Sequence, residues 1–433
     1  MASHNNPATE HPSALGRALS RVATIEPREL PAVVAAFLLF FFMWAGYFAV
    51  RPVRETIATI VGRDQIANVW IFTSIFSILI IPLYGWIVAR YRRSTFLPAM
   101  YGFVALVLAI TGLMLRGENI DPLTGKFFYV FISVVNLFLL SIFWSFLLEL
   151  FDGNQSKRLF GVIAAGGSAG ALTGPFISDL TAVHIGNSGI LFMGAAFFVA
   201  AIVCQRALLG IWRDRASAQT KAEERPIGGN IFAGVTLILK SPYILGIALF
   251  VFFISTVNTL LYFEQLRLVE VNYHEIIDRT RIFARFDWVV QTLTVLSQIF
   301  LTGRIAQKFG VIALVTAAPL IMVGGFALLA ATGTLGVLAV VWIGRRAMEY
   351  AFVRPGREML WAPLDKETKY KAKNTVDVPV YRASDAIVAQ INKFMEGAGF
   401  GPSLIATIGA GVALAWAVLG WWLGKSYGRM AKQ

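Results

Sequence analysis

The stretch AVVAAFLLFFFMWAGYFAVRPVRETIATIV covers residues 32–61 and joins a long apolar run to a group of charges. A bilayer core about 30 Å thick requires roughly 20 apolar residues in a spanning helix, and the residues before Arg51 supply them. Arg51, Arg54 and Glu55 then follow within sequence that is apolar on both sides. We therefore expect a membrane-spanning helix that carries charges inside its apolar sequence.

Similar apolar runs recur along the 433 residues, of which 57% are hydrophobic and only 15% are charged. Soluble domains have about a quarter of charged residues, so the composition indicates an integral membrane protein in contact with the lipid bilayer. The runs are too long for membrane strands and do not alternate, which predicts an all-α fold. The twelve predicted transmembrane helices lie near residues 30–58, 66–89, 95–115, 127–149, 160–183, 187–209, 243–266, 286–303, 311–332, 335–353, 376–397 and 400–424.

The sequence gives little support to metal, cofactor or enzyme chemistry. The single cysteine, Cys204, lies in an apolar run, and the four histidines are far apart. Neither a disulfide nor a metal site is predicted from this pattern. We find no phosphate-binding Gly-Lys-Ser/Thr loop and no nucleophile triad, so we expect no cofactor, no catalytic residues and no enzymatic activity.

The net charge of +13 arises from 38 Lys and Arg against 25 Asp and Glu. If the amino terminus lies inside the cell, most of these basic residues fall in the tails and cytoplasmic loops, as the positive-inside rule requires. We therefore predict a multi-pass protein of the inner (plasma) membrane with both termini in the cytoplasm. The net charge then indicates the orientation of the protein in the membrane, and we expect no nucleic acid as a partner. We also expect a monomer.

A polar, basic break at residues 211–242 divides the predicted helices into two sets of six. The predicted parts are a cytoplasmic tail 1–29, a six-helix bundle 30–210, a cytoplasmic linker 211–242, a second six-helix bundle 243–424 and a cytoplasmic tail 425–433. GWIVARYRRS at 85–94 and GRIAQKFG at 303–310 each place a glycine before a basic cluster, and they follow the second helix of each half. They resemble the loop between helices two and three of the major facilitator superfamily. This resemblance implies two halves built from inverted three-helix units, with the substrate site near the midplane between them.

The charges that follow the first apolar run have helical spacing. Arg51, Arg54 and Glu55 lie at i, i+3 and i+4 and share one helix face. Each charge would cost about 2.5 to 3.5 kcal/mol facing lipid at a helix centre, so we expect these three to face a cavity. The alternative is an ordinary helix end whose arginines reach the outer membrane interface.

The tenth predicted helix ends with VRPGREMLWAPL, in which Arg354, Arg357 and Glu358 repeat the pattern Arg-Pro-x-Arg-Glu. Other spans carry polar faces of the same kind, including Glu149, Asn258, Arg267, Asp287, Gln291, Thr294 and Gln298. The candidate substrate-binding residues are Arg51, Arg54, Glu55, Glu264, Arg345, Arg346, Glu349, Arg357, Arg382, Asp385 and Lys393. Each of these could instead belong to a structural ion pair. Acidic residues are almost as numerous as basic ones, so counting leaves the sign of the cavity open.

The run GVIAAGGSAGALTGP at residues 161–175 is rich in glycine and other small residues. Small residues let two membrane helices approach closely, so the run predicts tight helix packing. A gating hinge at Gly174 and Pro175 is the alternative interpretation.

The segment RPGREMLWAPLDKETKYKAKNTVD at 354–377 is similar to the matching segment of the nucleotide transporter family. These are the ATP/ADP translocases of intracellular bacteria and plastids, a distant arm of the major facilitator superfamily. SKRLFGVIAAGG at 156–167, RPVRETI in the first helix and YFEQ in the seventh resemble that family more weakly. The resemblance implies exchange of nucleotides or similar phosphorylated metabolites by alternating access.

In that family a basic residue of helix one and an acidic residue of helix seven are important for transport, and they match Arg54 and Glu264. This sequence departs from the family at Arg357, where the family has lysine, and at VYRASDA 380–386, which replaces a Gly-Lys-Ser region. Arginine can bind phosphate through two parallel hydrogen bonds where lysine is a point charge. We therefore expect an anionic substrate that need not be ATP itself.

The sequence thus predicts a transporter of nucleotides or other phosphorylated or anionic metabolites that works as an exchanger. A first alternative is a proton-coupled exporter of hydrophobic or cationic compounds, with Glu55, Glu149 or Glu264 as the proton carrier. A second alternative is a non-transporting membrane scaffold or sensor, in which paired charges would close the cavity.

Overall fold

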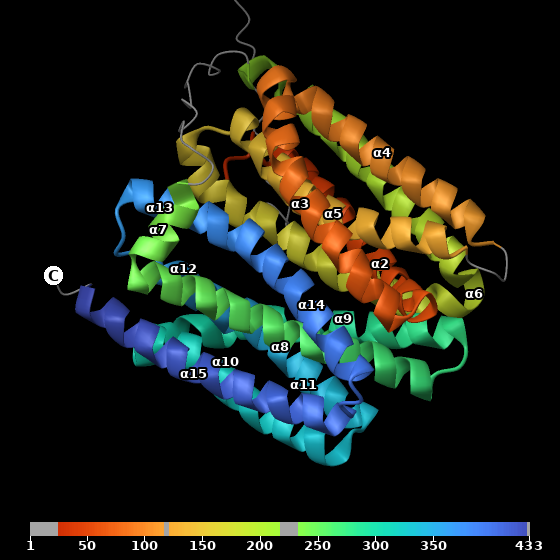
Figure 1. Ribbon diagram of the computed structural model, residues 1–433. Helices are drawn as coiled ribbons and strands as arrows, with labels where there is room; N and C mark the ends of the chain where they lie inside the picture. Colours follow the sequence, from red (N-terminus) through yellow and green to blue (C-terminus); the bar gives the residue numbers. More distant parts are fainter. Residues whose placement is uncertain (1–24, 117–120, 217–232, 431–433) are drawn as a thin grey trace, which may run out of the picture.

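The computed structural model describes residues 25–116, 121–216 and 233–430 of the chain (Figure 1). In these ranges the chain forms helices joined by short turns, and none of the described residues forms a strand. The predicted all-α membrane fold is confirmed. Most of the predicted tail 1–29 and the middle of the predicted linker 211–242 lie outside the described residues, as do residues 431–433.

The first part of the chain forms helices α2 to α6. Asp121 caps α5 by accepting a hydrogen bond of 2.9 Å from the backbone N–H of Thr124, which holds the pKa of this carboxyl below its ordinary value. Gly186 has φ +65, a conformation that glycine adopts without strain, and it divides α6 into two arms. The bounds are α2 Leu30–Val61, α3 Arg63–Arg90, α4 Arg93–Met114, α5 Pro122–Leu150 and α6 Gly153–Ala216.

The second part of the chain forms helices α7 to α15, with short π-helical segments η1, η2 and η3 between some of them. Such segments are frequent at functional sites of proteins. Pro355 lies two residues after the end of η2 and Pro379 lies in η3, and proline cannot donate a backbone hydrogen bond. The bounds are α7 Ala233–Lys240, α8 Pro242–Asn272, α9 Ile276–Ser297, η1 Gln298–Thr302, α10 Gly303–Thr332, α11 Leu335–Met348, η2 Glu349–Val353, α12 Arg354–Leu360, α13 Lys366–Thr375, η3 Val376–Val380, α14 Tyr381–Gly397 and α15 Pro402–Met430.

The twelve apolar runs predicted from the sequence all lie on helical segments, but several helices extend beyond the predicted ends. The largest difference is at α9, which begins at Ile276, ten residues before the predicted run 286–303. The runs near 160–183 and 187–209 are the two arms of α6. The run near 335–353 is α11 followed by η2, and α12 carries the helical path further, to Leu360. Of the described helices, seven are long and apolar enough to cross a membrane, and α6 contains two of the predicted spans.

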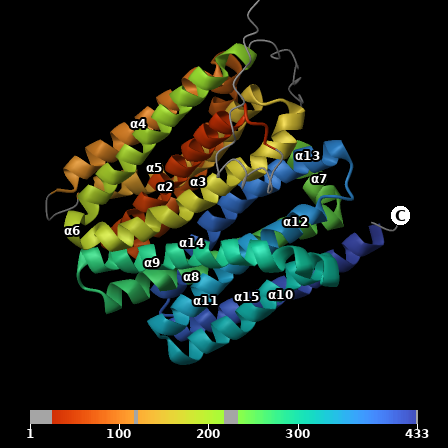
Figure 2. The ribbon, with the colours of Figure 1, turned by 180° about the vertical axis from the view of Figure 1, so that it is seen from behind.

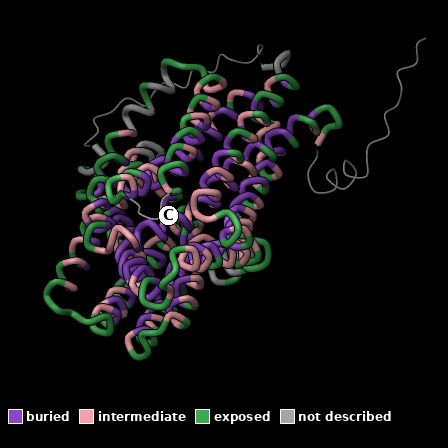
Figure 3. Tube along the Cα trace, turned by 90° about the vertical axis from the view of Figure 1, so that its right-hand side faces the viewer, coloured by how far each residue is buried: buried purple, intermediate pink, exposed green. Residues whose placement is uncertain are grey.

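Helices α2 to α6 gather in one bundle and helices α8 to α15 in another, as the two opposite views show (Figures 1 and 2). Each bundle has its own cluster of buried apolar side chains. Buried residues follow the interior of the molecule, while exposed residues follow its outer faces (Figure 3). In a membrane protein such exposed apolar faces meet lipid, which explains why large hydrophobic side chains occur on them.

The glycine-rich run of α6 packs directly against α2. A Cβ atom at Gly166 would lie 2.4 Å from the carbonyl oxygen of Phe37, and one at Gly170 would lie 2.2 Å from that of Phe41. Neither position could hold a side chain without moving the backbone of α2. The close helix packing predicted from this run is confirmed.

The two bundles contact each other at one end of the molecule, where α3 packs on α14 and α6 packs on α9. We call this the sealed end. The opposite end carries α7, α13 and the end of α15 (Figure 1). The polar contacts of the sealed end join Arg63 to Glu396 at 3.0 Å, Gln390 to the Ala67 carbonyl at 2.8 Å, Lys393 to Asn68 at 3.2 Å, Arg279 to Thr59 at 3.0 Å and Thr280 to Asn187 at 2.8 Å.

Candidate functional site

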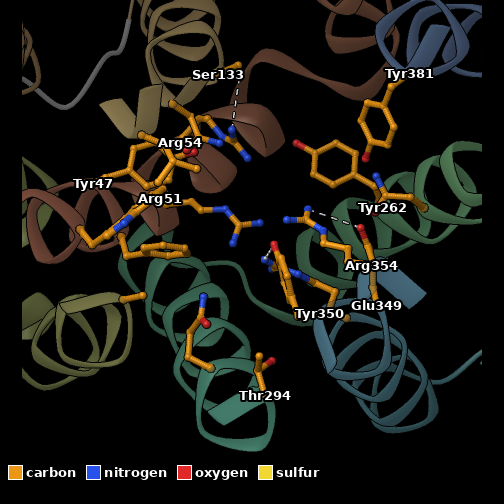
Figure 4. A pocket seen from close by; sticks show the side chains of 18 of the residues that line it. Tyr47, Arg51, Arg54, Ser133, Tyr262, Thr294, Glu349, Tyr350, Arg354 and Tyr381 are labelled. Atoms are coloured by element: carbon orange, nitrogen blue, oxygen red, sulfur yellow. Dashed lines mark hydrogen bonds and ion pairs between the residues drawn. The ribbon is translucent and has the colours of Figure 1, made fainter. Parts of the chain in front are cut away.

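A cavity of about 690 Å³ lies between the two bundles and is lined by helices of both. We call it the central cavity. Its lining extends from Trp70 on α3 to Arg357 on α12 and Asp377 on η3. Arg51 and Arg354 reach toward each other across it from opposite sides (Figure 4). The charged residues of its lining are Arg51, Arg54, Glu55, Arg345, Arg346, Glu349, Arg354, Arg357, Asp377, Arg382 and Asp385.

Asp287 of α9 binds arginines from both bundles. Its Oδ1 accepts a hydrogen bond of 2.8 Å from Arg51 of α2 and one of 2.7 Å from Arg346 of α11. The residue is 3% exposed, and its Oδ2 has no hydrogen-bond partner among the described residues. Two guanidinium charges therefore share this single carboxylate, which also joins the two bundles.

Arg54 and Glu55 form a second ion pair, in direct contact on α2. Tyr262 of α8 donates a hydrogen bond of 2.8 Å to Glu55 Oε2, and its hydroxyl lies 2.8 Å from that of Tyr129 on α5. Arg54 also donates to the Ser133 hydroxyl at 3.2 Å. These contacts fix the charges of α2 against α5 and α8.

Glu349 begins η2 and lies between two arginines. Arg345 is 2.9 Å from its Oε2 and Arg354 is 3.6 Å from its Oε1. Arg345 also donates to Asn258 Oδ1 at 2.9 Å. The Arg354 guanidinium lies over the Tyr350 ring, 4.4 Å from its centroid. With its side chain 52% exposed, Arg354 is the most accessible of the described cavity arginines.

The part of the cavity lining near η3 and α14 contains two looser ion pairs. Arg357 lies 3.4 Å from Asp377, and Arg382 lies 3.7 Å from Asp385. Asp385 also accepts a hydrogen bond of 2.6 Å from the Ser255 hydroxyl of α8. The Arg357 pair joins α12 to η3, whereas the Arg382 pair lies within α14, and the side chains of both arginines are less than one-fifth exposed.

The described lining residues include seven arginines and four carboxylates. Asp287 adds a fifth carboxylate directly behind this lining. The central cavity therefore has an excess of positive charge, which the sequence left open. Carboxylates alone do not balance it.

Nine of the eleven predicted substrate-binding residues line the central cavity, and the other two lie elsewhere. Glu264 pairs with Arg267 at 2.6 Å and lines a separate pocket of about 260 Å³ that also includes Arg63. Lys393 donates to Asn68 at 3.2 Å in the sealed end. In this conformation neither residue can contact a ligand held by the cavity arginines. Glu149, named as a possible proton carrier, pairs with Arg93 at 2.6 Å outside the cavity lining.

The charges of the first predicted helix occupy the cavity and not an outer interface. The side chains of Arg51 and Arg54 are each 12% exposed, and both residues line the central cavity. The expectation that they face a cavity is confirmed, and the alternative of an interfacial anchor is wrong.

The sequence-based candidates omit Arg354 and the aromatic part of the wall. The signal for the aromatic residues was present in α2, where Phe40, Trp44 and Phe48 recur every four residues and lead to Arg51 one turn later. Apolar runs hide this signal, because aromatic residues are equally common where a helix meets lipid. The aromatic cavity residues are Phe40, Trp44, Tyr47, Phe48, Trp70, Tyr129, Tyr262, Trp342, Tyr350 and Tyr381.

Two helical bundles around a charged cavity that is closed at one end define a membrane transporter. The chain belongs to the Major Facilitator Superfamily, whose family model matches residues 33–352. It is therefore a multi-pass membrane transporter and not an enzyme.

Curated relatives include carriers of adenine nucleotides. ADP,ATP carrier protein 1 of Chlamydia trachomatis is 25% identical over 297 residues, which cover 60% of this chain and 56% of that protein. ADP,ATP carrier protein 2 of Chlamydia pneumoniae is 25% identical over 443 residues, covering 82% of this chain and 80% of that protein. The chain thus spans little more than half the length of the first of these relatives. The predicted resemblance to ATP/ADP translocases is confirmed as a resemblance.

Solved structures with a similar fold are also transporters. A bacterial homologue of the iron transporter ferroportin, in an inward-facing state, aligns with a TM-score of 0.66 at 12% identity, over 91% of this chain and 99% of that one. The nucleoside transporter NupG aligns with a TM-score of 0.64 at 13% identity, over 94% of this chain and 100% of that one. At such low identity these matches show the fold alone.

Proposed function

We propose that the protein exchanges nucleotides or other phosphorylated anions across the inner membrane by alternating access. The observation that carries this proposal is the excess of arginines in the central cavity, seven against four carboxylates. Guanidinium groups bind phosphate through parallel, charge-assisted hydrogen bonds. A ligand with two or more negative charges would supply the charge that the carboxylates leave unbalanced.

The cavity arginines differ in how firmly the protein holds them. Arg345 and Arg346 are 4% and 6% exposed on their side chains and bind carboxylates at 2.9 and 2.7 Å. Arg354 is half exposed, lies 3.6 Å from Glu349 and reaches toward Arg51 (Figure 4). We infer that Arg354 and Arg51 take the phosphate groups, while the buried arginines set the positive potential of the site.

The proposed exchange mechanism rests on the free-energy cost of enclosing the cavity arginines when no substrate is bound. Enclosing guanidinium charges without counter-ions costs several kcal/mol per ion, even after the protein relaxes. A bound phosphate group supplies the counter-charge and lowers this cost. The loaded carrier should therefore reorient more readily than the empty one, which is the condition for obligatory exchange.

Alternating access gives the two ends of the molecule their proposed roles. We propose that the halves 30–210 and 243–424 move about the central cavity, with the sealed end outside and both termini in the cytoplasm. The described conformation is then the one open to the cytoplasm. Both walls of the site come from one chain, which supports transport by a monomer.

The rival transport mechanism, proton coupling, requires a carboxylate that is free to take up a proton. Each of the four cavity carboxylates lies within 4 Å of an arginine, so none of these four is without a cationic partner. A scaffold or sensor would have its charges closed into pairs, whereas Arg354 stands half exposed in an open cavity. Both observations favour the anion exchanger.

The test is uptake of labelled ATP into proteoliposomes that are either loaded with ADP or empty. We expect rapid uptake into loaded vesicles, slow uptake into empty ones and no effect of an uncoupler. Arg54→Gln should abolish the exchange, whereas Arg429→Gln, an exposed position on α15, should not change it. Equal uptake into empty vesicles would contradict exchange. Uncoupler-sensitive transport of hydrophobic cations, without any response to phosphorylated compounds, would favour the exporter.

A further inference from the structure

The wall of the central cavity next to Arg51 is aromatic on α2 and made of small residues on α6. Phe40, Trp44 and Phe48 lie one turn apart on one face of α2, and all three line the cavity. Ala164, Gly167, Ser168 and Ala171 of α6 line the same cavity. We call this set of seven residues the aromatic slot.

The two sides of the aromatic slot adjoin each other because of the register between α2 and α6. A Cβ atom at Gly167 would lie 2.4 Å from the Phe40 ring, and one at Gly170 would lie 3.0 Å from the backbone nitrogen of Ala45. The small residues around Gly167 therefore lie beside the segment of α2 that carries the aromatic rings. Ser168 is exposed, so the slot opens to the cavity at this position.

The rings of the slot are not equivalent. Phe40 is 4% exposed and stacks on Phe143 with centroids 3.9 Å apart, so one of its faces is already covered. Trp44 and Phe48 are half-buried and meet each other at a tilt of 44°. Among the ring contacts of the described residues, none stacks parallel on Trp44. Trp44 therefore offers a ring face to a ligand, and the edge of the slot next to it is formed by Phe48.

We propose that the aromatic slot is the subsite for a planar heteroaromatic ring, the base of a nucleotide whose phosphates bind the cavity arginines. This inference rests on the proposed function and deepens it. Trp44 and Arg51 are seven residues apart, about 10 Å along the helix axis. A ribose with one or two phosphate groups bridges that distance. The Arg51 guanidinium lies 5.9 Å from the Phe48 ring centroid, which places the charge directly beside the slot.

The lining also sets what the slot can distinguish. Stacking accepts any base, because every base has a π-face, and the slot's own residues offer only the Ser168 hydroxyl and the Trp44 indole N–H as polar side-chain groups. The slot should therefore respond to ring size more than to base identity. Purine nucleotides should bind more tightly than pyrimidine nucleotides, and adenine and guanine should differ little.

The experiment measures binding of ADP, UDP and inorganic pyrophosphate to the purified full-length protein at fixed ionic strength. Trp44→Ala should weaken ADP binding by roughly 10- to 100-fold, the range expected for one lost stacking contact. Pyrophosphate, which has no ring, should bind the variant as it binds the native protein. Trp44→Phe should restore most of the ADP affinity, and Trp421→Ala, on an exposed face of α15, is the matched control.

A second variant approaches the slot from α6 and leaves every aromatic ring in place. Ser168→Phe should fill the slot from its exposed side and weaken ADP binding without changing pyrophosphate binding. A parallel loss of ADP and pyrophosphate binding in both variants would overturn the subsite, as would unchanged ADP binding in both. If the native protein bound pyrophosphate and ADP equally well, the proposed base subsite would be contradicted, while the proposed anion site would remain supported. If it bound neither, the proposed function would fail first.

Discussion

The contact between Asp179 of α6 and α9 offers a direct test of how the sealed end is held. Arg285 Nε lies 3.1 Å from both carboxylate oxygens of Asp179, and Arg281 Nε lies 3.5 Å from one of them. The Asp179 side chain is 11% exposed, while those of Arg281 and Arg285 are 33% and 48% exposed. One largely buried carboxylate thus holds two partly exposed arginines of the other bundle.

The size of the effect follows from this geometry. A hydrogen bond to a charged group contributes about 1.5 to 3 kcal/mol, and exposure of the arginines lowers the value toward the bottom of that range. Asp179→Asn should therefore weaken the sealed state by about 1.5 to 2 kcal/mol, or roughly 10- to 30-fold in the equilibrium between the sealed and open states of this end.

The assay uses a single reporter thiol. In a Cys204→Ala background, which removes the natural cysteine, Ala67→Cys places a thiol at a fully buried position of the sealed end. A membrane-impermeant maleimide added from outside should label it roughly 10- to 30-fold faster when Asp179 is replaced by Asn. Asp278→Asn is the matched control, because Asp278 pairs at 3.7 Å with Arg281 inside the same helix and spans no interface. Unchanged labelling of the Asp179 variant, or equal acceleration by both variants, would refute the reasoning.

Three further predictions concern the centre, the packing and the topology of the molecule. Asp287→Asn should lower stability by about 3 to 5 kcal/mol, because it leaves the buried Arg346 guanidinium without its carboxylate and leaves Arg51 with only Glu55, at 3.7 Å. Added pyrophosphate should restore part of the loss in a thermal unfolding assay; no loss would mean that water or other groups neutralise these arginines. Gly170→Leu should prevent folding of the first bundle, as judged by size-exclusion chromatography in detergent. The control Gly161→Leu should fold normally, because nothing lies within 4 Å of its added Cβ. Equal behaviour of the two variants would argue against the packing of α6 on α2. Reporter fusions within 211–242 and at the carboxyl terminus should both read cytoplasmic, and one external signal would break the predicted topology.

The sequence by itself determined where the membrane helices lie and that the glycine-rich run at 161–175 packs closely against another helix. Hydrophobicity over about 20 residues is a local property, because each spanning helix satisfies its own backbone hydrogen bonds in lipid. The twelve predicted runs therefore coincide with helical segments. The glycine-rich run near Gly170 likewise predicted close packing, since small residues act at the point where they occur.

The sequence also predicted that Arg51, Arg54 and Glu55 face a cavity, because lipid is a costly environment for charges, and the structure decided between this location and the membrane interface. The sequence did not determine which charged residues pair with one another. Asp287 binds Arg51 from 236 positions away along the chain, and no spacing rule reaches that far.

Only the tertiary structure decided the location of Glu264 and Lys393, the sign of the cavity charge and the aromatic slot. Glu264 and Lys393 are charged like the cavity residues, yet Glu264 lines a separate pocket. Lys393 lies about three turns beyond Arg382 along α14 and therefore reaches the sealed end. Trp44 has the same sequence context as a lipid-facing aromatic residue, and only the position of α6 beside α2 makes it part of the cavity. Helix rotation and register arise from packing between elements distant in the chain, so a local pattern can indicate that a side chain is buried but not which partner it meets.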